Sequence, residues 1–204
     1  MQAGKSGANQ QRRIGLTGGI GMGKTAISSY LAAQQIPVLD ADIYAREAVE
    51  PNSRVLAEVM SRYGTNIVLP DGNLDRPRLA EIIFTSPAEK TWLEQQIHPF
   101  VRDRLETELR RLADAPILLL VIPLLFEAQM TDLTTEVWVV HIPQAQQEQR
   151  LKARDRLNIE QIRARIDGQM AIAQKVRQAD VVLDNASSLE ALYQQVDQAL
   201  KTSE

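Results

Sequence analysis

The sequence contains no cysteine and only two histidines, His98 and His141. These absences exclude disulfides, thiolate zinc sites, a cysteine nucleophile and a histidine-rich metal site. Aromatic residues make up only 4% of the chain and the net charge is −3, so neither base stacking nor a general attraction to nucleic acid or anionic membranes is indicated. No apolar leader and no run of 18 apolar residues occurs. We therefore expect a cytoplasmic protein without nucleic-acid or membrane partners.

The composition is typical of one folded unit. Apolar residues make up 44% of the chain and charged residues 24%, which excludes disorder and collagen-like structure. The 204 residues are too few for two ordinary independent domains. Residues 1–12 are polar and without periodicity, and we expect a flexible tail there. We expect the protein to be a monomer.

Apolar runs of strand length alternate with helical patterns along the rest of the chain. The runs are residues 14–16, 36–39, 117–122, 137–142 and 181–183. Short buried runs separated by helices predict an α/β fold with a five-stranded parallel sheet covered on both faces.

The spacing between these runs predicts how the chain is divided. About 75 residues separate the second run from the third, far more than a βα crossover needs. We expect a helical insertion there, at residues 51–114, and a second helical segment, a lid, at residues 144–178. The core would then comprise residues 13–50, 115–143 and 179–204. The expected helices are residues 55–63, 78–84, a pair at 87–97 and 100–113 broken at Pro99, and a final helix at 189–201. We expect the polar residues 144–149 to form the solvent-exposed start of a helix.

A glycine-rich segment follows the first apolar run. Gly18 and Gly23 have four residues between them and precede Lys24 and Thr25, which fits the phosphate-binding pattern G-x-x-x-x-G-K-[ST]. Glycines let backbone N–H groups turn toward phosphate oxygens, the lysine carries positive charge to the β and γ phosphates, and the threonine hydroxyl can bind Mg²⁺. The alternative, a glycine-rich turn without a ligand, does not require Lys-Thr at that position. The predicted ATP-binding residues are Gly18, Gly19, Gly21, Met22, Gly23, Lys24, Thr25 and Ala26.

Other nucleotide-binding classes lack their motifs in this sequence. The glycines do not fit G-x-G-x-x-G, which excludes the dinucleotide fingerprint. The guanine motif N-K-x-D, the switch motif D-x-x-G and the transporter signature L-S-G-G-Q are also absent. Two helical segments beside a triphosphate loop favour a small-molecule kinase, which needs an acceptor site and a lid that excludes water.

Two aspartates end the second apolar run. Asp40 and Asp42 should lie near the glycine-rich loop, because the carboxyl ends of parallel strands meet at one edge of a sheet. One carboxylate can accept the proton of the acceptor hydroxyl and one can organise Mg²⁺-bound water. The alternative for each is a helix N-cap.

The lid segment is basic. Between residues 150 and 177 it has eight basic and three acidic residues. Arg150 and Arg154 are four apart and share a helix face, so both can approach the transferred phosphoryl group. The basic residues are Arg150, Lys152, Arg154, Arg156, Arg163, Arg165, Lys175 and Arg177.

Taken together, these residues resemble the dephospho-coenzyme A kinase family over nearly the whole chain, from Ile14 to about Leu192. The matching stretches are residues 16–24, 40–51, 92–93, 98–99, 123–127, 150–155 and 179–185. The resemblance implies transfer of the ATP γ-phosphoryl group to the ribose 3′-hydroxyl of dephospho-CoA, with Mg²⁺. It also implies a P-loop nucleotide-kinase-like three-layer α/β/α fold, with a helical CoA-binding insertion and a lid.

The resemblance also assigns roles to single residues. It matches Asp42 with the catalytic base and Arg150 with the lid arginine near the phosphates. It also matches Asp40, Arg46, His98 and Glu127 with family positions, and we expect these four residues to bind the substrate. The structural alternative for His98, before Pro99, is a helix break, and for Glu127 it is a strand-end carboxylate that caps the next element.

Three positions depart from the family pattern. The family commonly has serine at the position of Met22 and Ser-Thr at the positions of Thr25 and Ala26. We expect Met22 to point its side chain outward and to offer a backbone N–H, and Ala26 to lose only an auxiliary phosphate contact. Two alternatives to a dephospho-coenzyme A kinase remain. One is another small-molecule kinase, acting on a nucleoside or nucleotide, and the other is a non-catalytic ATP-binding switch.

Overall fold

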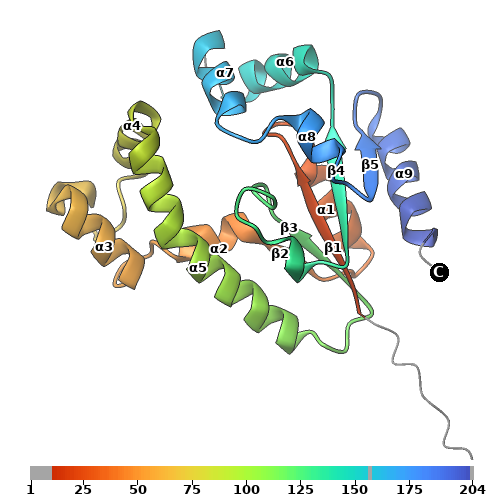
Figure 1. The fold of residues 1–204 in the computed structure, drawn as a ribbon, viewed down its shortest axis with the longest axis horizontal. Helices are drawn as coiled ribbons and strands as arrows, with labels where there is room; N and C mark the ends of the chain where they lie inside the picture. Colours follow the sequence, from red (N-terminus) through yellow and green to blue (C-terminus); the bar gives the residue numbers. More distant parts are fainter. Residues whose placement is uncertain (1–10, 156–157, 203–204) are drawn as a thin grey trace, which may run out of the picture. The chain divides into compact units, whose positions relative to one another are not determined.

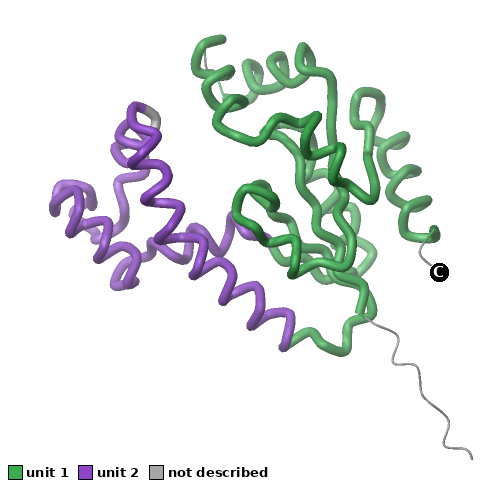
Figure 2. Tube along the Cα trace, in the orientation of Figure 1, with its two compact units in different colours: residues 1–39, 111–204 green, residues 40–110 purple. Residues whose placement is uncertain are grey.

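The computed structural model describes residues 11–155 and 158–202, apart from the side chain of residue 84. The first ten residues of the predicted tail and Arg156 of the basic segment therefore lie outside the described residues. The chain forms two compact units, one from residues up to 39 and from 111 onward, the other from residues 40–110 (Figure 2). Each unit has its own apolar core.

The first unit contains a five-stranded parallel sheet. Its strands are β1 (Arg12–Gly18), β2 (Val38–Asp40), β3 (Ile117–Val121), β4 (Glu136–His141) and β5 (Val181–Asp184). They lie in the order β2-β3-β1-β4-β5, and β1 pairs in parallel with both β3 and β4. The five predicted strands are confirmed. Because the chain adds strands first on one side of β1 and then on the other, the carboxyl end of β1 is the switch point where such sheets bind ligands.

Helices cover the sheet of the first unit (Figure 1). They are α1 (Lys24–Ala33), α6 (Gln144–Asp155), α7 (Ile159–Asp167), α8 (Ile172–Val176) and α9 (Leu189–Lys201), with a 3-10 turn, η2 (Thr131–Leu133). Ile14 and Leu16 of β1 alternate onto one face, where they share a buried cluster with Leu31 of α1 and Val196 of α9. On the other face a Cβ atom at Gly15 would lie 2.6 Å from the Thr134 side chain. Side chains therefore pack closely against both faces of β1.

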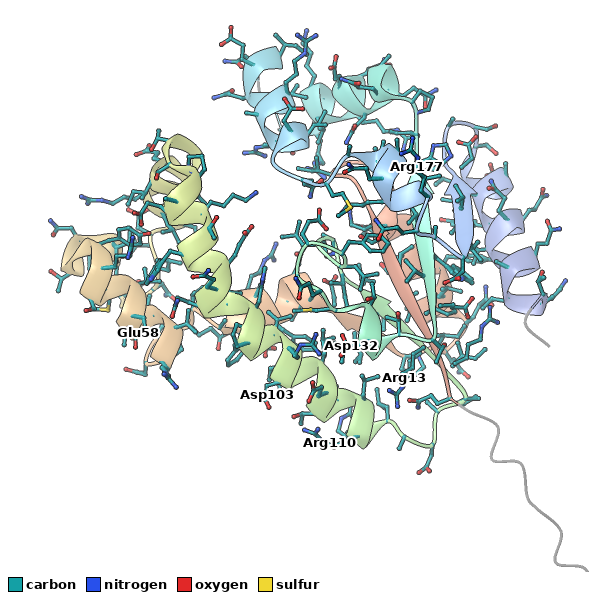
Figure 3. All side chains as sticks on the ribbon, in the orientation of Figure 1. Arg13, Glu58, Asp103, Arg110, Asp132 and Arg177 are labelled. Atoms are coloured by element: carbon teal, nitrogen blue, oxygen red, sulfur yellow. The ribbon has the colours of Figure 1, made fainter. Side chains whose placement is uncertain are left out.

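The second unit lies in sequence between β2 and β3 and is helical. It contains α2 (Ala41–Glu47), α3 (Arg54–Tyr63), η1 (Thr65–Ile67), α4 (Arg76–Thr85) and α5 (Pro87–Arg111). Ser53 and Asp75 cap α3 and α4 by accepting backbone N–H hydrogen bonds at 3.1 Å. The unit begins at Asp40 and not at residue 51, because Ala48 and Val49, which follow α2, are buried in its core. Charged side chains such as Glu58 on α3 and Asp103 and Arg110 on α5 are exposed to solvent (Figure 3).

A charged and aromatic cluster joins α3 to α5 within the second unit. Glu89 accepts hydrogen bonds from the Arg62 guanidinium at 2.6 and 2.8 Å and from the Tyr63 hydroxyl at 2.6 Å. The Arg62 guanidinium lies 4.5 Å from the centroid of the Trp92 ring. Hydrogen bonds from Arg62, and then from Tyr63, lower the pKa of Glu89 to about 2. Burial, followed by the Glu89 carboxylate, raises the pKa of Tyr63 to about 12.

The predicted break at Pro99 is wrong, because α5 is one continuous helix with Pro99 inside it. Proline removes one backbone N–H, but Gln95, whose carbonyl loses that partner, is exposed and can be hydrated. Leu93 before the proline and Val101 and Leu105 after it are all buried on the same helix. Their burial on both sides of Pro99 favours a continuous helix over a break.

Over residues 11–155 and 158–202, no helix is both long and apolar enough to cross a bilayer.

Candidate active site

The glycine-rich loop joins the carboxyl end of β1 to the start of α1. Gly18, Gly21 and Gly23 have φ values of 146°, 74° and 110°, which side-chain-bearing residues rarely adopt. Close packing adds a second requirement, since a Cβ atom at Gly18 would lie 2.4 Å from the Val140 carbonyl oxygen. The N-cap of α1 is Gly23, which has no side chain to satisfy the first amides of the helix. The loop thus has the geometry of an anion site at a helix N-terminus.

Lys24, the first residue of α1, extends its side chain back across this loop. Its Nζ donates hydrogen bonds to the carbonyl oxygens of Gly18 at 2.8 Å and Gly19 at 3.1 Å. The ammonium group therefore lies beside the backbone that would surround a phosphate. Thr25, in the first turn of the same helix, is exposed.

The expectation that Met22 points outward is wrong. Its side chain is 2% exposed and belongs to the core cluster that contains Ile14 and Leu16. Its Sδ also accepts a hydrogen bond from the Gly19 N–H at 3.2 Å. A long, flexible thioether can turn inward and fill such a gap, which a serine could not do. Ala26 is half-buried and packs against the same core.

Three amide side chains from distant parts of the sequence hold the loop backbone. The Gln147 side-chain amide donates to the Ile20 carbonyl at 2.8 Å, and the Gln169 side-chain oxygen accepts from the Ile20 N–H at 2.9 Å. The Asn185 side-chain amide donates to the Met22 carbonyl at 2.9 Å. None of these three contacts was predicted from the sequence. Gln147 lies in the block that was expected to be a solvated helix start, although it is only 2% exposed.

Arg150, on α6, is connected to this loop framework. Its guanidinium donates a hydrogen bond to the backbone carbonyl of Asn185 at 2.8 Å, and Asn185 in turn contacts the loop. Arg154 lies one turn further along α6, where it is exposed and pairs with the neighbouring Asp155 at 2.6 Å. This pairing raises the pKa of Arg154 and lowers that of Asp155. Of the two predicted lid arginines, the structure connects Arg150 with the loop and pairs Arg154 with its neighbour.

Much of the remaining basic segment is paired or exposed. Arg163 pairs with Glu148 at 3.4 Å and Arg165 with Asp155 at 3.2 Å. Arg177, after α8, is exposed (Figure 3). The charge of the basic segment is thus partly neutralised by acidic residues of the same segment, residues 144–178.

Glu127 forms a buried ion pair that the sequence did not predict. Lys175, which is 0% exposed, lies 2.9 Å from the Glu127 carboxylate and also donates to the Pro123 carbonyl at 2.8 Å. The same carboxylate accepts a hydrogen bond from the Met170 N–H at 2.9 Å. Glu127 therefore joins the segment after β3 to residues 170–175, and the capping alternative is wrong, because neither η2 nor α8 has a side-chain cap. From the sequence alone, Lys175 could not be distinguished from the solvent-exposed basic residues around it.

The four predicted residues of the second unit divide into different environments. Asp40 is the N-cap of α2, and its side chain accepts the Asp42 N–H at 2.9 Å. Asp42, in the first turn, and Arg46, in the last turn, are both exposed. His98 is half-buried within α5, so the helix-break alternative for it is wrong.

A cavity of about 300 Å³ in the second unit brings Asp42 and Arg46 together with Arg76 of α4. These three residues are exposed, whereas Leu74, Leu79 and Leu93, which also line it, are buried. The cavity therefore has an apolar floor and a charged rim. The remaining lining residues are Ala45, Val49, Ala80, Ile83 and Ile97.

Comparison with known proteins gives consistent results. The sequence profile of a family described as dephospho-CoA kinase matches residues 12–191. A dephospho-CoA kinase from Trichormus variabilis is 55% identical over 193 residues, which cover 93% of this chain and 97% of that protein. A Thermus thermophilus crystal structure is similar with a TM-score of 0.79 and 35% identity over 96% of this chain and 99% of that one. A dephospho-CoA kinase from Campylobacter jejuni is similar with a TM-score of 0.69 and 25% identity, over 94% and 96% of the two chains.

Proposed function

Since the chain belongs to the dephospho-CoA kinase family, we propose how its own residues divide the work of that family's reaction. The reaction is the ATP-dependent phosphorylation of the ribose 3′-hydroxyl of dephospho-CoA, which gives coenzyme A and ADP and completes CoA biosynthesis. The observation that best supports a phosphoryl-transfer role is the Lys24 ammonium group, which lies over a loop of left-handed glycines at the start of α1.

The glycine-rich loop is the proposed ATP site. The amides from Gly21 to Ala26 would surround the phosphates, and the N-terminal dipole of α1 favours their negative charge. Lys24 would exchange its hydrogen bonds to the Gly18 and Gly19 carbonyls for contacts with the β and γ phosphates. Met22 would contribute its backbone N–H alone, because its side chain is buried.

The residues present fit a magnesium ion bound mainly through the nucleotide. Within the part of the chain that the structure describes, no three His, Cys, Asp or Glu side chains gather as a metal site. Mg²⁺ commonly takes phosphate oxygens and waters with only one or two protein ligands, and the exposed Thr25 hydroxyl would be one. When bound, the ion would neutralise charge on the transferred phosphoryl group.

The second unit is the proposed dephospho-CoA site. Arg46 and Arg76 line its cavity and carry the charge needed to pair with the diphosphate of dephospho-CoA, while the apolar floor would take an uncharged part of the molecule. Asp42 lines the same cavity and is the proposed base for the 3′-hydroxyl. Asp40 would orient it by capping α2. A contact of His98 with the substrate stays a prediction.

Positioning and charge stabilisation would contribute most to the rate. Phosphoryl transfer passes through a loose transition state, so an oriented hydroxyl and an in-line phosphate matter more than a strong base. Arg150 would stabilise the negative charge on the transferred group. We assign Arg154 an auxiliary role that requires it to leave Asp155.

Three further expectations are also proposals. The insertion and the segment of residues 144–178 would act as acceptor domain and lid. The protein would be a monomer, and its lack of cysteine suits the reducing cytoplasm.

A steady-state assay with ATP, Mg²⁺ and dephospho-CoA tests the assignment directly. We expect ADP and a product phosphorylated at the ribose 3′ position, identified by phosphorus NMR. Nucleosides, nucleotides and shikimate serve as control acceptors and should give at most about one hundredth of the kcat/KM, because they lack the contacts of the full substrate. Preference for a control acceptor would indicate another small-molecule kinase. ATP binding without transfer to any acceptor would indicate a nucleotide switch.

A further inference from the structure

Asn185 follows β5 directly and is one of the few buried polar residues of the first unit, with 3% of its surface exposed. Its backbone N–H donates to the His141 carbonyl at 3.0 Å, which fixes the residue against the end of β4. A buried amide side chain is costly unless it is hydrogen-bonded. The partner of this one is the glycine-rich loop.

The side-chain amide of Asn185 donates to the Met22 carbonyl at 2.9 Å. Met22 and Gly23 share one planar trans peptide, in which the C=O and the N–H point in opposite directions. Holding the Met22 carbonyl toward Asn185 therefore turns the Gly23 N–H away from Asn185. An amide that is turned away from Asn185 in this way is left to face a phosphate bound by the loop.

The contact depends on the glycine at position 23. A Cβ atom there would lie 2.1 Å from the side-chain nitrogen of Asn185. Two separate features therefore require glycine at position 23. One is its φ of 110°, and the other is the close approach of the Asn185 side chain.

The same residue is also joined to the lid. The backbone carbonyl of Asn185 accepts the hydrogen bond from the Arg150 guanidinium at 2.8 Å. One residue thus fixes a peptide of the ATP loop with its side chain and the proposed phosphate-contacting arginine with its main chain.

We propose that Asn185 is a positioning residue for phosphoryl transfer. It sets the Gly23 amide for the ATP phosphates and holds Arg150 beside the loop, and the second of these roles rests on the proposed function. In this role Asn185 acts through the Met22–Gly23 peptide and Arg150.

Two substitutions separate its hydrogen bond from its volume. Asn185→Ala removes both, whereas Asn185→Leu keeps a similar volume and removes only the hydrogen bond. For each we expect the Kd of Mg·ATP, measured by calorimetry without dephospho-CoA, to rise about tenfold, as the loss of a buried hydrogen-bond partner implies. The KM for dephospho-CoA should change less than about twofold, since the acceptor makes no use of the loop amides.

Tyr30→Phe is the matched control. It removes a hydrogen bond of 3.0 Å between α1 and Asp197 of α9, so it should lower the stability of the same unit. We expect an unchanged Kd for Mg·ATP in this variant. Wild-type affinity in Asn185→Leu, or an equal rise in Kd for Tyr30→Phe, would overturn the proposal.

A measurement on the wild-type protein tests the proposal without any substitution. On addition of Mg·ATP, the backbone amide resonance of Gly23 should shift strongly in a ¹⁵N–¹H NMR spectrum, and an unmoved resonance would refute the assigned orientation. If the wild-type protein failed to phosphorylate dephospho-CoA, the proposed function would fall, while the ATP affinities would still decide the role of Asn185.

Discussion

The buried ion pair between Lys175 and Glu127 allows a stability prediction with a definite asymmetry. The ammonium group of Lys175 is completely buried, whereas the Glu127 side chain is 22% exposed. Glu127→Gln leaves the charge of Lys175 in place with only the Pro123 carbonyl and an amide oxygen as partners. Lys175→Met instead leaves a carboxylate that water can reach and that still accepts the Met170 N–H.

The expected magnitudes follow from the cost of an unpaired buried charge. Removing one partner of a buried pair typically costs about 3–5 kcal/mol. Because the amide oxygen of glutamine keeps one contact with Lys175, we expect Glu127→Gln to lower the free energy of unfolding by about 2–3 kcal/mol. Lys175→Met should cost about 1 kcal/mol less, since the remaining charge is partly hydrated.

Urea denaturation of the two single variants and the double variant measures these effects. In the double variant no charge is left buried, so we expect it to recover at least half of the loss caused by Glu127→Gln. A loss below about 0.5 kcal/mol for Glu127→Gln, which is the range of ordinary surface substitutions, would refute the reasoning.

The same variants also test the predicted role of Glu127 in substrate binding. If the role of Glu127 is only structural, the KM for dephospho-CoA should be unchanged in the double variant, in which stability is largely recovered. A raised KM that persists after stability is restored would assign Glu127 a contact with the substrate.

Further predictions concern catalysis, stability and pH. Asp42→Asn should lower kcat by about 10²–10⁴-fold with unchanged ATP affinity, and full turnover in a steady-state assay would remove Asp42 from the mechanism. Arg150→Ala should lower kcat more than it raises the KM for dephospho-CoA, because its contact strengthens as charge develops; the reverse pattern would place it on the acceptor. Met22→Ala should lower the free energy of unfolding by about 2–5 kcal/mol, since it leaves a cavity in the core, and a much smaller loss in urea denaturation would contradict its burial. The pKa of Glu89 falls from 4.5 to about 2, so the stabilisation from its ionised form is complete above pH 4.5 and is lost as the pH falls toward 2. Glu89→Gln should therefore flatten the pH dependence of stability in that window, and an unchanged slope in denaturation between pH 4.5 and 2 would exclude the assigned cause.

The strands and the glycine-rich loop could be predicted because their signals are local. Each strand is a short apolar run, and Gly18, Gly23 and Lys24 carry their chemistry within seven residues. The helix at residues 189–201 was likewise predicted with its observed bounds.

The features that were missed depend on partners far away in the sequence. Gln147 is 127 residues from Ile20, and Lys175 is 48 residues from Glu127. A polar residue that is buried and satisfied by a distant partner looks the same in the sequence as one in water. The inward turn of Met22 and the continuity of α5 through Pro99 are also consequences of tertiary packing, which outweighed local preference.

The position of Asn185 late in the sequence determines when, during synthesis of the chain, the glycine-rich loop can acquire this hydrogen bond. The glycine-rich loop follows the first strand, but one of the three side-chain amides that hold it follows the last strand, 163 residues later. During synthesis from the N-terminus, the loop sequence emerges early and this amide much later. A nascent chain released before residue 185 would contain the whole phosphate-binding motif and still lack the residue that holds the Met22 carbonyl. We therefore expect ATP to protect the finished chain against proteolysis far better than it protects such fragments.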